Sequence, residues 1–134
     1  MTDDSPPIRA VYDRIGSHFS QTRRYPWTDV TDFLDTVSGE VGLDVGCGNG
    51  RHMEAMAPAV TRPIGLDLSR TLLQEAQSRL ADSGVEATFL QGTATALPLG
   101  DSAVDVGLYI AAIHHLRERA ARVRSLNELA RVLR

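Results

Sequence analysis

The residues of this chain that could do chemistry begin with three glycines at alternate positions, Gly46, Gly48 and Gly50. A short apolar run, residues 41–45, leads into them, and a segment with helical spacing, residues 51–57, follows at once. This order predicts a strand, a tight loop and a helix start. Glycines in such a loop let the backbone approach a ligand closely and adopt positive φ, so we expect a binding loop here.

Two acidic residues narrow the choice of ligand. Asp67 ends the next apolar run, at the place where a nucleotide ribose presents its hydroxyls. Asp44 stands just before the loop, where a carboxylate can hold an ammonium group or a water. A dinucleotide site requires Gly-x-Gly-x-x-Gly, and Arg51 occupies the position of its third glycine. The pattern therefore favours an aminoacyl nucleoside, S-adenosylmethionine; the alternative is a glycine-rich turn without a ligand.

Helical and strand patterns alternate around this loop. Ser69 is the expected helix N-cap and Gly84 the expected helix stop, with a stripe of leucine and alanine between them. Such alternation is typical of an α/β fold with a parallel sheet and right-handed crossovers. We expect the other helices over residues 8–19, 28–37, 51–57 and 117–133, and strands over 41–45, 64–66, 87–90 and 103–110.

The apolar positions indicate which side chains form the core. Met53 and Met56 are expected to fill the core under the first crossover helix. The last helix is amphipathic. Its apolar stripe consists of Leu116, Ala120, Val123, Leu126, Ala130 and Leu133.

Composition limits the compartment and the partners. The net charge of −3 predicts no general affinity for nucleic acid by itself. All fourteen basic residues are arginine, which fits either a GC-rich genome or a salt-adapted proteome.

Cys47 is the sole cysteine, so no internal disulfide forms, and its small side chain suits the loop sterically. With no long apolar stretch and no signal peptide, we expect a cytoplasmic protein and no membrane contact. Residues 1–7 are expected to be a flexible N-terminus, and residues 8–134 a single domain.

With these residues in view, the chain resembles the class I S-adenosylmethionine-dependent methyltransferases over residues 12–134. The glycine loop, Asp67, the Ala96-Leu97-Pro98 stretch and the Leu-Arg ending carry the resemblance. It implies a Rossmann-like parallel sheet of the class I methyltransferase type with N-terminal helices. The last three strands of the family are expected to be missing, as in a C-terminally truncated domain. These motifs are specific to the cofactor and give little information about the substrate.

The resemblance also assigns the cofactor site. Thr93 occupies the place where the superfamily often has an Asp that reads the adenine amino group. Adenine recognition would therefore be weak or fall to the backbone of Ala94. The candidate cofactor-binding residues are Asp44, Gly46, Cys47, Gly48, Asn49, Asp67, Leu68, Thr93, Ala94 and Ile110.

A narrower resemblance, to the tRNA wobble-uridine methyltransferases, rests on the two ends of the chain. Its motifs are Tyr12-Asp13-Arg14-Ile15, then His18 to Arg23, Pro26-Trp27, Phe33-Leu34 and Ile113-His114-His115. That family esterifies 5-carboxymethyluridine at the first anticodon position and includes a domain fused to an AlkB-like hydroxylase. A carboxylate acceptor is already ionised at neutral pH, so catalysis would need no general base, only positioning and exclusion of water.

On this resemblance the substrate-side candidates follow their chemistry. Arginines can hold a carboxylate or phosphate with two hydrogen bonds, and aromatic rings can stack on an unpaired anticodon base. His115 is the candidate catalytic residue because it follows the fourth strand, where the acceptor would enter. The candidate substrate-binding residues are Tyr12, Arg23, Trp27, His114, Arg119 and Arg122.

Plainer readings stay open. The arginines of the last helix would also suit a solvated helix face, Trp27 would also suit the core, and the histidine pair would also suit the end of a strand. No metal is expected.

The expected partners are the tRNA anticodon loop, a small zinc-binding activator protein near the third strand, and a second copy along the exposed edge of the fourth strand. The alternative functions are a small-molecule methyltransferase of the quinone or lipid type and a non-catalytic cofactor-binding or scaffold module.

Overall fold

The computed structural model describes residues 25–110 and 112–134, except for the side chain of His114. The expected flexible N-terminus (residues 1–7) and the expected helix over residues 8–19 therefore lie outside the described residues. No helix in the described ranges is long and apolar enough to cross a membrane.

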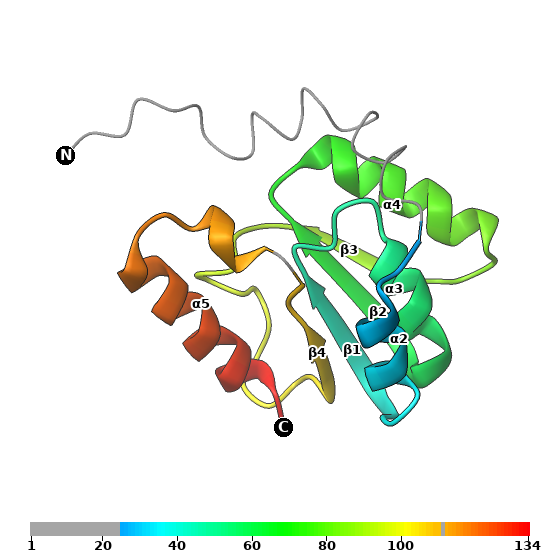
Figure 1. The fold of residues 1–134 in the computed structure, drawn as a ribbon, viewed down its shortest axis with the longest axis horizontal. Coiled ribbons are helices and arrows are strands. Elements are labelled where there is room, and N and C mark those ends of the chain that lie inside the picture. Colours follow the sequence, from blue (N-terminus) through cyan, green and yellow to red (C-terminus); the bar gives the residue numbers. More distant parts are fainter. Residues whose placement is uncertain (1–24, 111) are drawn as a thin grey trace.

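A parallel sheet of four strands forms the centre of the described fold (Figure 1). The strands are β1 (Gly39–Val45), β2 (Val60–Asp67), β3 (Thr88–Gln91) and β4 (Val106–Leu108), in the order β3-β2-β1-β4. The expected α/β class and parallel pairing are confirmed. β3 begins one residue later than expected, and β4 is much shorter than the expected strand over residues 103–110.

The short fourth strand has a neighbour at its beginning. Val104 lies before β4 and forms a parallel bridge with Leu133 instead of continuing the β1 ladder. The Val104 N–H donates to the Val132 carbonyl at 2.8 Å, and the Arg134 N–H donates to the Val104 carbonyl at 2.9 Å. β4 is therefore an edge strand of the described sheet, as expected, but the backbone just before it is already paired.

In the part of the chain that the structure describes, four α-helices surround the sheet: α2 (Thr28–Leu34), α3 (Arg51–Met56), α4 (Arg70–Asp82) and α5 (Arg119–Val132). Single 3-10 turns, η1 (Ala57–Ala59) and η2 (Ile113–His115), complete the connections. α2 ends three residues before its expected end, because the Thr36 hydroxyl donates to the Phe33 carbonyl at 2.7 Å and competes with helical pairing. The Ser69 cap and the Gly84 stop of α4 are confirmed: Ser69 Oγ accepts from the Leu72 N–H, and Gly84 has a φ of 70°.

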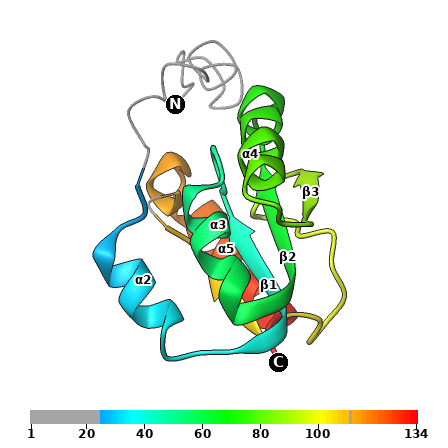
Figure 2. The ribbon, with the colours of Figure 1, turned by 90° about the vertical axis from the view of Figure 1, so that its right-hand side faces the viewer.

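Two apolar clusters fill the space on the two faces of the sheet. The first joins α2, α3 and α4 to the strands and contains Val30, Leu34, Met53, Met56, Val60, Leu80, Val106 and Leu108, which confirms both methionines as core residues. The second joins α5 and the loop after β3 to the strands and contains Leu43, Val45, Leu66, Leu97, Val104 and Val132. Figure 2 shows α2 and α3 together on one side of the sheet.

The expected apolar stripe of the last helix is wrong in its orientation. Val123 and Leu126 are 47% and 50% exposed, whereas Ser125 and Val132 are buried. Two contacts fix this rotation of α5. Tyr109 Oη donates to Ser125 Oγ at 3.0 Å. Leu129 also packs where Gly107 has no side chain, so that a Cβ there would meet its Cδ1 at 3.1 Å.

Candidate functional site

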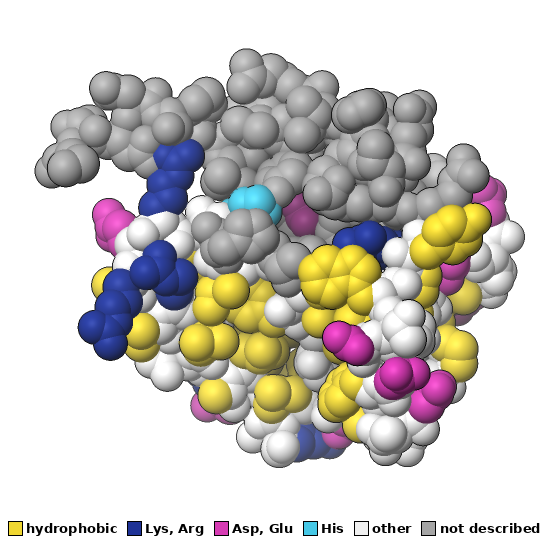
Figure 3. All heavy atoms as spheres, in the orientation of Figure 1, with side chains coloured by type: hydrophobic (Ala, Val, Ile, Leu, Met, Phe, Trp, Pro, Cys, Tyr) yellow, Lys and Arg dark blue, Asp and Glu magenta, His cyan; other side chains and the backbone are white. Residues whose placement is uncertain are grey.

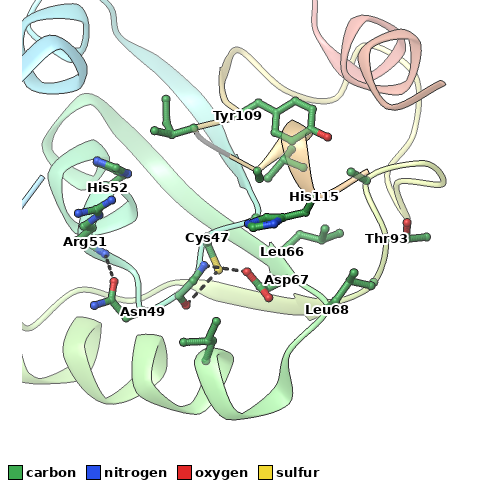
Figure 4. Close-up of a pocket in the computed structure, with 18 of the residues that line it drawn as sticks. Cys47, Asn49, Arg51, His52, Leu66, Asp67, Leu68, Thr93, Tyr109 and His115 are labelled. Atoms are coloured by element: carbon green, nitrogen blue, oxygen red, sulfur yellow. Dashed lines mark hydrogen bonds between the residues drawn. The ribbon is translucent and has the colours of Figure 1, made fainter. Parts of the chain in front are cut away.

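A cavity of about 260 Å³ lies at the carboxyl ends of the strands (Figure 4). The loop after β1, the end of β2, the loop after β3 and the residues after β4 all contribute to its wall. The strand order reverses between β1 and β4, and in open parallel sheets ligands bind outside the strand ends at such a switch point. The cavity is therefore the candidate binding site.

The glycine loop has the backbone that the sequence predicts. Gly46 has a φ of 73°, and a Cβ there would come within 2.6 Å of the Ala112 Cβ. Gly50 has a φ of 86° and lies against Leu80 and Ala76 of α4, where a Cβ would come within 2.9 and 3.1 Å. Both positions thus exclude other residues for two reasons, conformation and space. They bring the backbone between β1 and α3 close to the cavity.

Asp67 holds this loop with its carboxylate. Its Oδ2 accepts a hydrogen bond from the Gly48 N–H at 2.9 Å, and its Oδ1 accepts from the Ser69 N–H at 2.9 Å. The neighbouring Leu66 carbonyl accepts from the N–H groups of Gly46 and Cys47 at 2.7 and 2.9 Å. The end of β2 therefore fixes the loop after β1. Each carboxylate oxygen has two lone pairs, so Asp67 can also accept from the hydroxyls of a ribose.

Asp44 is a buried carboxyl beside the loop. It is 2% exposed, and its Oδ2 has no hydrogen-bond partner among the described residues. Burial raises the pKa of Asp44 to about 8; the charge of Asp67 adds to the rise, and the charge of Arg51 opposes it. A buried acceptor without a partner is costly, so the site is suited to a ligand that brings a donor or a positive charge.

The side chain of Cys47 is part of the packing. It lines the cavity, is 6% exposed, and has a pKa raised by burial. The thiol is therefore protonated at neutral pH and is a poor nucleophile. Its Sγ would lie 2.9 Å from a Cβ at Gly65, which indicates the steric role that the sequence predicts.

One wall of the cavity comes from Trp27, the residue before α2, and from the first residues of α3. His52 Nε2 accepts a hydrogen bond from the backbone N–H of Trp27 at 3.1 Å, and the centroids of the two rings are 5.6 Å apart in an edge-to-face arrangement. Burial lowers the pKa of His52 to about 4, with the charges of Arg51 and Arg79 acting in the same direction. His52 is thus a neutral acceptor at physiological pH. Trp27 is 46% exposed, which excludes the alternative that it belongs to the core.

The opposite wall depends on the loop after β3. Thr93 and Ala94 line the cavity, and Thr93 Oγ1 lies 2.9 Å from Thr95 Oγ1. Arg131 of α5 anchors this loop further along, with Nη1 donating to the Leu99 carbonyl at 2.8 Å and Nη2 donating to the Leu97 carbonyl at 3.0 Å. α5 therefore supports the cavity without lining it.

The predicted site residues fall into four groups: on the cavity wall, behind it, away from it, and outside the described residues. Nine of the ten candidate cofactor-binding residues line this one cavity: Gly46, Cys47, Gly48, Asn49, Asp67, Leu68, Thr93, Ala94 and Ile110. Asp44 is buried behind the wall, and Trp27 and His115 are part of the wall. Tyr12, Arg23 and the side chain of His114 lie outside the described residues. The functional roles of all of them stay predictions.

Two predicted substrate residues lie away from the cavity wall. Arg119 is exposed at the start of α5. Arg122 follows one turn later, and its Nη1 donates to the carbonyls of Leu116 and Arg117 at 2.8 and 2.9 Å. Arg122 therefore closes the turn before α5, a contact that sequence spacing does not reveal. Its proposed contact with a substrate stays a prediction.

Three lining residues with polar side chains were not expected: Arg51, His52 and Tyr109. Arg51 directly follows the glycine loop, so its position in the sequence was a usable signal. The expected apolar positions of the fourth strand are the even-numbered residues 104–110. Tyr109 lies between two of them, so its side chain points to the opposite face of the strand. Nothing in the sequence marked His52. In residues 25–110 and 112–134, no group of three or more His, Cys, Asp or Glu side chains could hold a metal ion.

Comparison with known proteins agrees with this geometry. The sequence profile of the family described as "Methyltransferase domain" matches residues 43–134, from the end of β1 to the end of the chain. The chain belongs to the methyltransferase domain family. Its cofactor is accordingly S-adenosylmethionine, and the site fits this molecule: Asp67 can accept from its ribose hydroxyls, and the unpartnered Asp44 oxygen can accept from its ammonium group.

Two relatives and one solved structure are informative. The chain is 36% identical over 128 residues to tRNA (carboxymethyluridine(34)-5-O)-methyltransferase ALKBH8 of Mus musculus, covering 95% of this chain and 18% of that protein. It is 35% identical over 130 residues to the tRNA (carboxymethyluridine(34)-5-O)-methyltransferase of Saccharomyces cerevisiae, covering 95% and 44%. The chain thus spans less than half of either relative. A Haloferax volcanii methyltransferase in complex with the Trm112 methyltransferase activator has the same fold, with a TM-score of 0.79, 23% identity, and coverage of 95% and 56%.

Proposed function

We propose that this domain binds S-adenosylmethionine and transfers its methyl group to the carboxylate of 5-carboxymethyluridine at the wobble position of tRNA. The observation that carries the proposal is the cavity itself. A ribose acceptor at Asp67 and an exposed aromatic ring at Trp27 are both on its wall. The similarity to two tRNA carboxymethyluridine methyltransferases over 95% of the chain supports this acceptor.

Bound S-adenosylmethionine supplies an electrophilic methyl group on a sulfonium. The residues of this chain then have to bind, orient and exclude water, because an ionised carboxylate needs no proton removed. Asp67 and the glycine loop orient the nucleoside end. Trp27 offers a half-exposed ring for stacking on an unpaired base, the usual contact for single-stranded RNA loops. His115, on the cavity wall, is in position to contact the acceptor.

The partners of the domain are part of the same proposal. The Haloferax volcanii complex supports a Trm112-type activator as a protein partner. β3 is the natural strand for it, since it is an edge strand of the described sheet. A second copy along β4 is a further proposed contact, although the bridge between Val104 and Leu133 already occupies the approach to that edge. A cytoplasmic location is proposed from the absence of disulfide-forming cysteines.

The direct test is methyl transfer with purified chain, S-adenosylmethionine and two tRNA transcripts that differ only in carrying 5-carboxymethyluridine or uridine at the wobble position. The assay is run with and without a Trm112-type activator. We expect the methyl ester to form on the first transcript alone. Methylation of a small acid without tRNA would instead favour a small-molecule methyltransferase. Cofactor binding without turnover on any acceptor would favour a binding module.

A further inference from the structure

Among the described residues on the cavity wall, Arg51 is the sole arginine, and the wall contains no lysine. Figure 4 shows Arg51 and His52 together at one end of the cavity, with Leu68 and Thr93 at the other end. Asp67, the proposed ribose acceptor, lies between the two ends in Figure 4, so a base beside Leu68 and Thr93 leaves the ribose at Asp67. A nucleoside held there therefore points its amino-acid end toward Arg51.

Two contacts hold the Arg51 side chain against the residues that precede α2. Its Cζ lies 5.4 Å from the centroid of the Trp27 ring, within range of a cation–π interaction. Its Nη1 donates to the Tyr25 carbonyl at 3.3 Å. The hydrogen bond from the Trp27 N–H to His52 Nε2 in turn fixes the beginning of α2. The guanidinium therefore has a defined position at the mouth of the cavity.

Charge complementarity identifies the group that Arg51 would meet. The amino-acid end of S-adenosylmethionine is a zwitterion with one ammonium and one carboxylate. Asp44 presents a buried oxygen without a partner among the described residues, and this oxygen suits the ammonium. Asp44 and Arg51 flank the glycine loop that lines the cavity, one just before it and one just after it, so they can serve the two halves of one zwitterion. The carboxylate then requires a cation, and a guanidinium matches its geometry with two parallel hydrogen bonds.

We propose that Arg51 is a cofactor-binding residue whose guanidinium pairs with the carboxylate of the cofactor's amino-acid end. Trp27 and His52 act as positioning residues for it. This inference rests on the proposed function, because it requires S-adenosylmethionine in the cavity. A phosphate of the tRNA is the competing ligand for the same guanidinium, and the experiment separates the two.

The experiment is calorimetric titration of four proteins with two ligands. The proteins are the wild type, Arg51→Met, Arg51→Lys and the control Arg124→Met, which changes an exposed arginine of α5. The ligands are S-adenosylhomocysteine and its analogue that lacks the carboxylate but keeps the amine. Wild type and Arg124→Met should bind the complete ligand roughly 10- to 100-fold more tightly than the analogue, as expected for a hydrogen-bonded charge pair.

Arg51→Met should bind both ligands within about twofold of each other, since the carboxylate has then lost its partner. The preference of Arg51→Lys for the complete ligand should fall between those of Arg51→Met and wild type, because lysine keeps the positive charge but cannot form the two parallel hydrogen bonds of a guanidinium. Equal weakening of both ligands by Arg51→Met would mean that Arg51 acts on the fold or on another ligand, and would overturn the assignment. Unchanged binding of both ligands by Arg51→Met would also overturn it, and a separate titration of Arg51→Met with tRNA that shows lost affinity would then assign the guanidinium to a phosphate. If wild type binds neither ligand, the proposed function itself is wrong.

Discussion

The carboxylate of Asp67 and the backbone N–H of Gly48 are joined by a hydrogen bond of 2.9 Å that connects the end of β2 to the loop after β1. The same carboxylate caps the turn at Ser69. The residue expected to bind the ribose is therefore also the residue that shapes the loop beside it. Loop geometry and cofactor affinity should depend on the same side chain.

We predict that Asp67→Asn weakens both folding and cofactor binding. Asparagine keeps one acceptor oxygen, so it cannot accept from Gly48, Ser69 and a ribose together. Loss of one hydrogen-bond partner of this half-buried carboxylate should lower the free energy of unfolding by about 1–3 kcal/mol, and affinity for S-adenosylhomocysteine should fall roughly 10- to 100-fold. Denaturant unfolding and calorimetry measure the two effects. Asp82→Asn, at the exposed end of α4, is the matched control. Full stability with lost affinity would contradict the double role.

Asp44 gives a prediction in pH. Its pKa is 3.8 in the unfolded chain and about 8 in the folded protein, so between these values the folded state holds a proton that the unfolded state lacks. Its contribution to stability is thus complete below pH 3.8 and is lost as pH rises toward 8. His52 acts in the opposite sense. Its pKa falls from 6.5 to about 4, so stability is lost as pH decreases through that interval.

The effects of Asp44 and His52 on the free energy of unfolding oppose each other between pH 4 and 6.5. Between pH 6.5 and 8, Asp44 is the one of the two that still changes it. In the upper window the free energy of unfolding of the wild type should fall by up to ~1.4 kcal/mol per pH unit. Asp44→Asn, which keeps the shape and removes the titration, should make this part of the profile flat. Denaturant unfolding at a series of pH values measures the slope. An unchanged slope in Asp44→Asn would show that Asp44 is ionised in the folded protein.

The fold and most of the cavity wall could be predicted from the sequence because their causes are local. Glycines with positive φ, the Ser69 cap and the Gly84 stop each act within a few residues. The rotation of α5 could not be predicted, because it depends on Tyr109 reaching Ser125 and on Leu129 packing over Gly107. Both are contacts between segments far apart in the chain, and hydrophobic spacing alone favours the wrong face.

Trp27 gives a direct optical readout, since it is the sole tryptophan of the chain. It is half-exposed at the cavity and contacts both Arg51 and His52. Saturation with S-adenosylhomocysteine should change its emission, and Trp27→Phe should abolish the signal. His52→Leu should shift the emission of the free protein to the red, because the backbone N–H of Trp27 then loses its acceptor and the indole ring loses the His52 ring that packs against it. His52→Gln, which keeps an acceptor, should restore the wild-type spectrum. Equal spectra for all three proteins would show that His52 does not position Trp27.

Arg131 should control cofactor affinity from outside the cavity. Besides the Leu97 and Leu99 carbonyls, its guanidinium donates to Glu128 Oε2 at 2.6 Å and to Asp101 Oδ1 at 2.8 Å, and Glu128 Oε1 accepts from the Leu97 N–H at 2.8 Å. These bonds tie the loop after β3, which carries Thr93 and Ala94, to α5. Arg131→Met should therefore lower the midpoint of thermal unfolding and weaken binding of S-adenosylhomocysteine several-fold.

The part of this effect that is specific to the loop can be separated from general destabilisation. The loop supports the nucleoside end of the cavity, so Arg131→Met should weaken the binding of adenosine and the binding of S-adenosylhomocysteine by the same factor. Arg51→Met, at the other end, should weaken S-adenosylhomocysteine alone. Arg124→Met, on the exposed side of α5, should leave both affinities unchanged. If Arg131→Met lowers the unfolding midpoint but binds both ligands like wild type, then the anchor stabilises α5 without shaping the cavity.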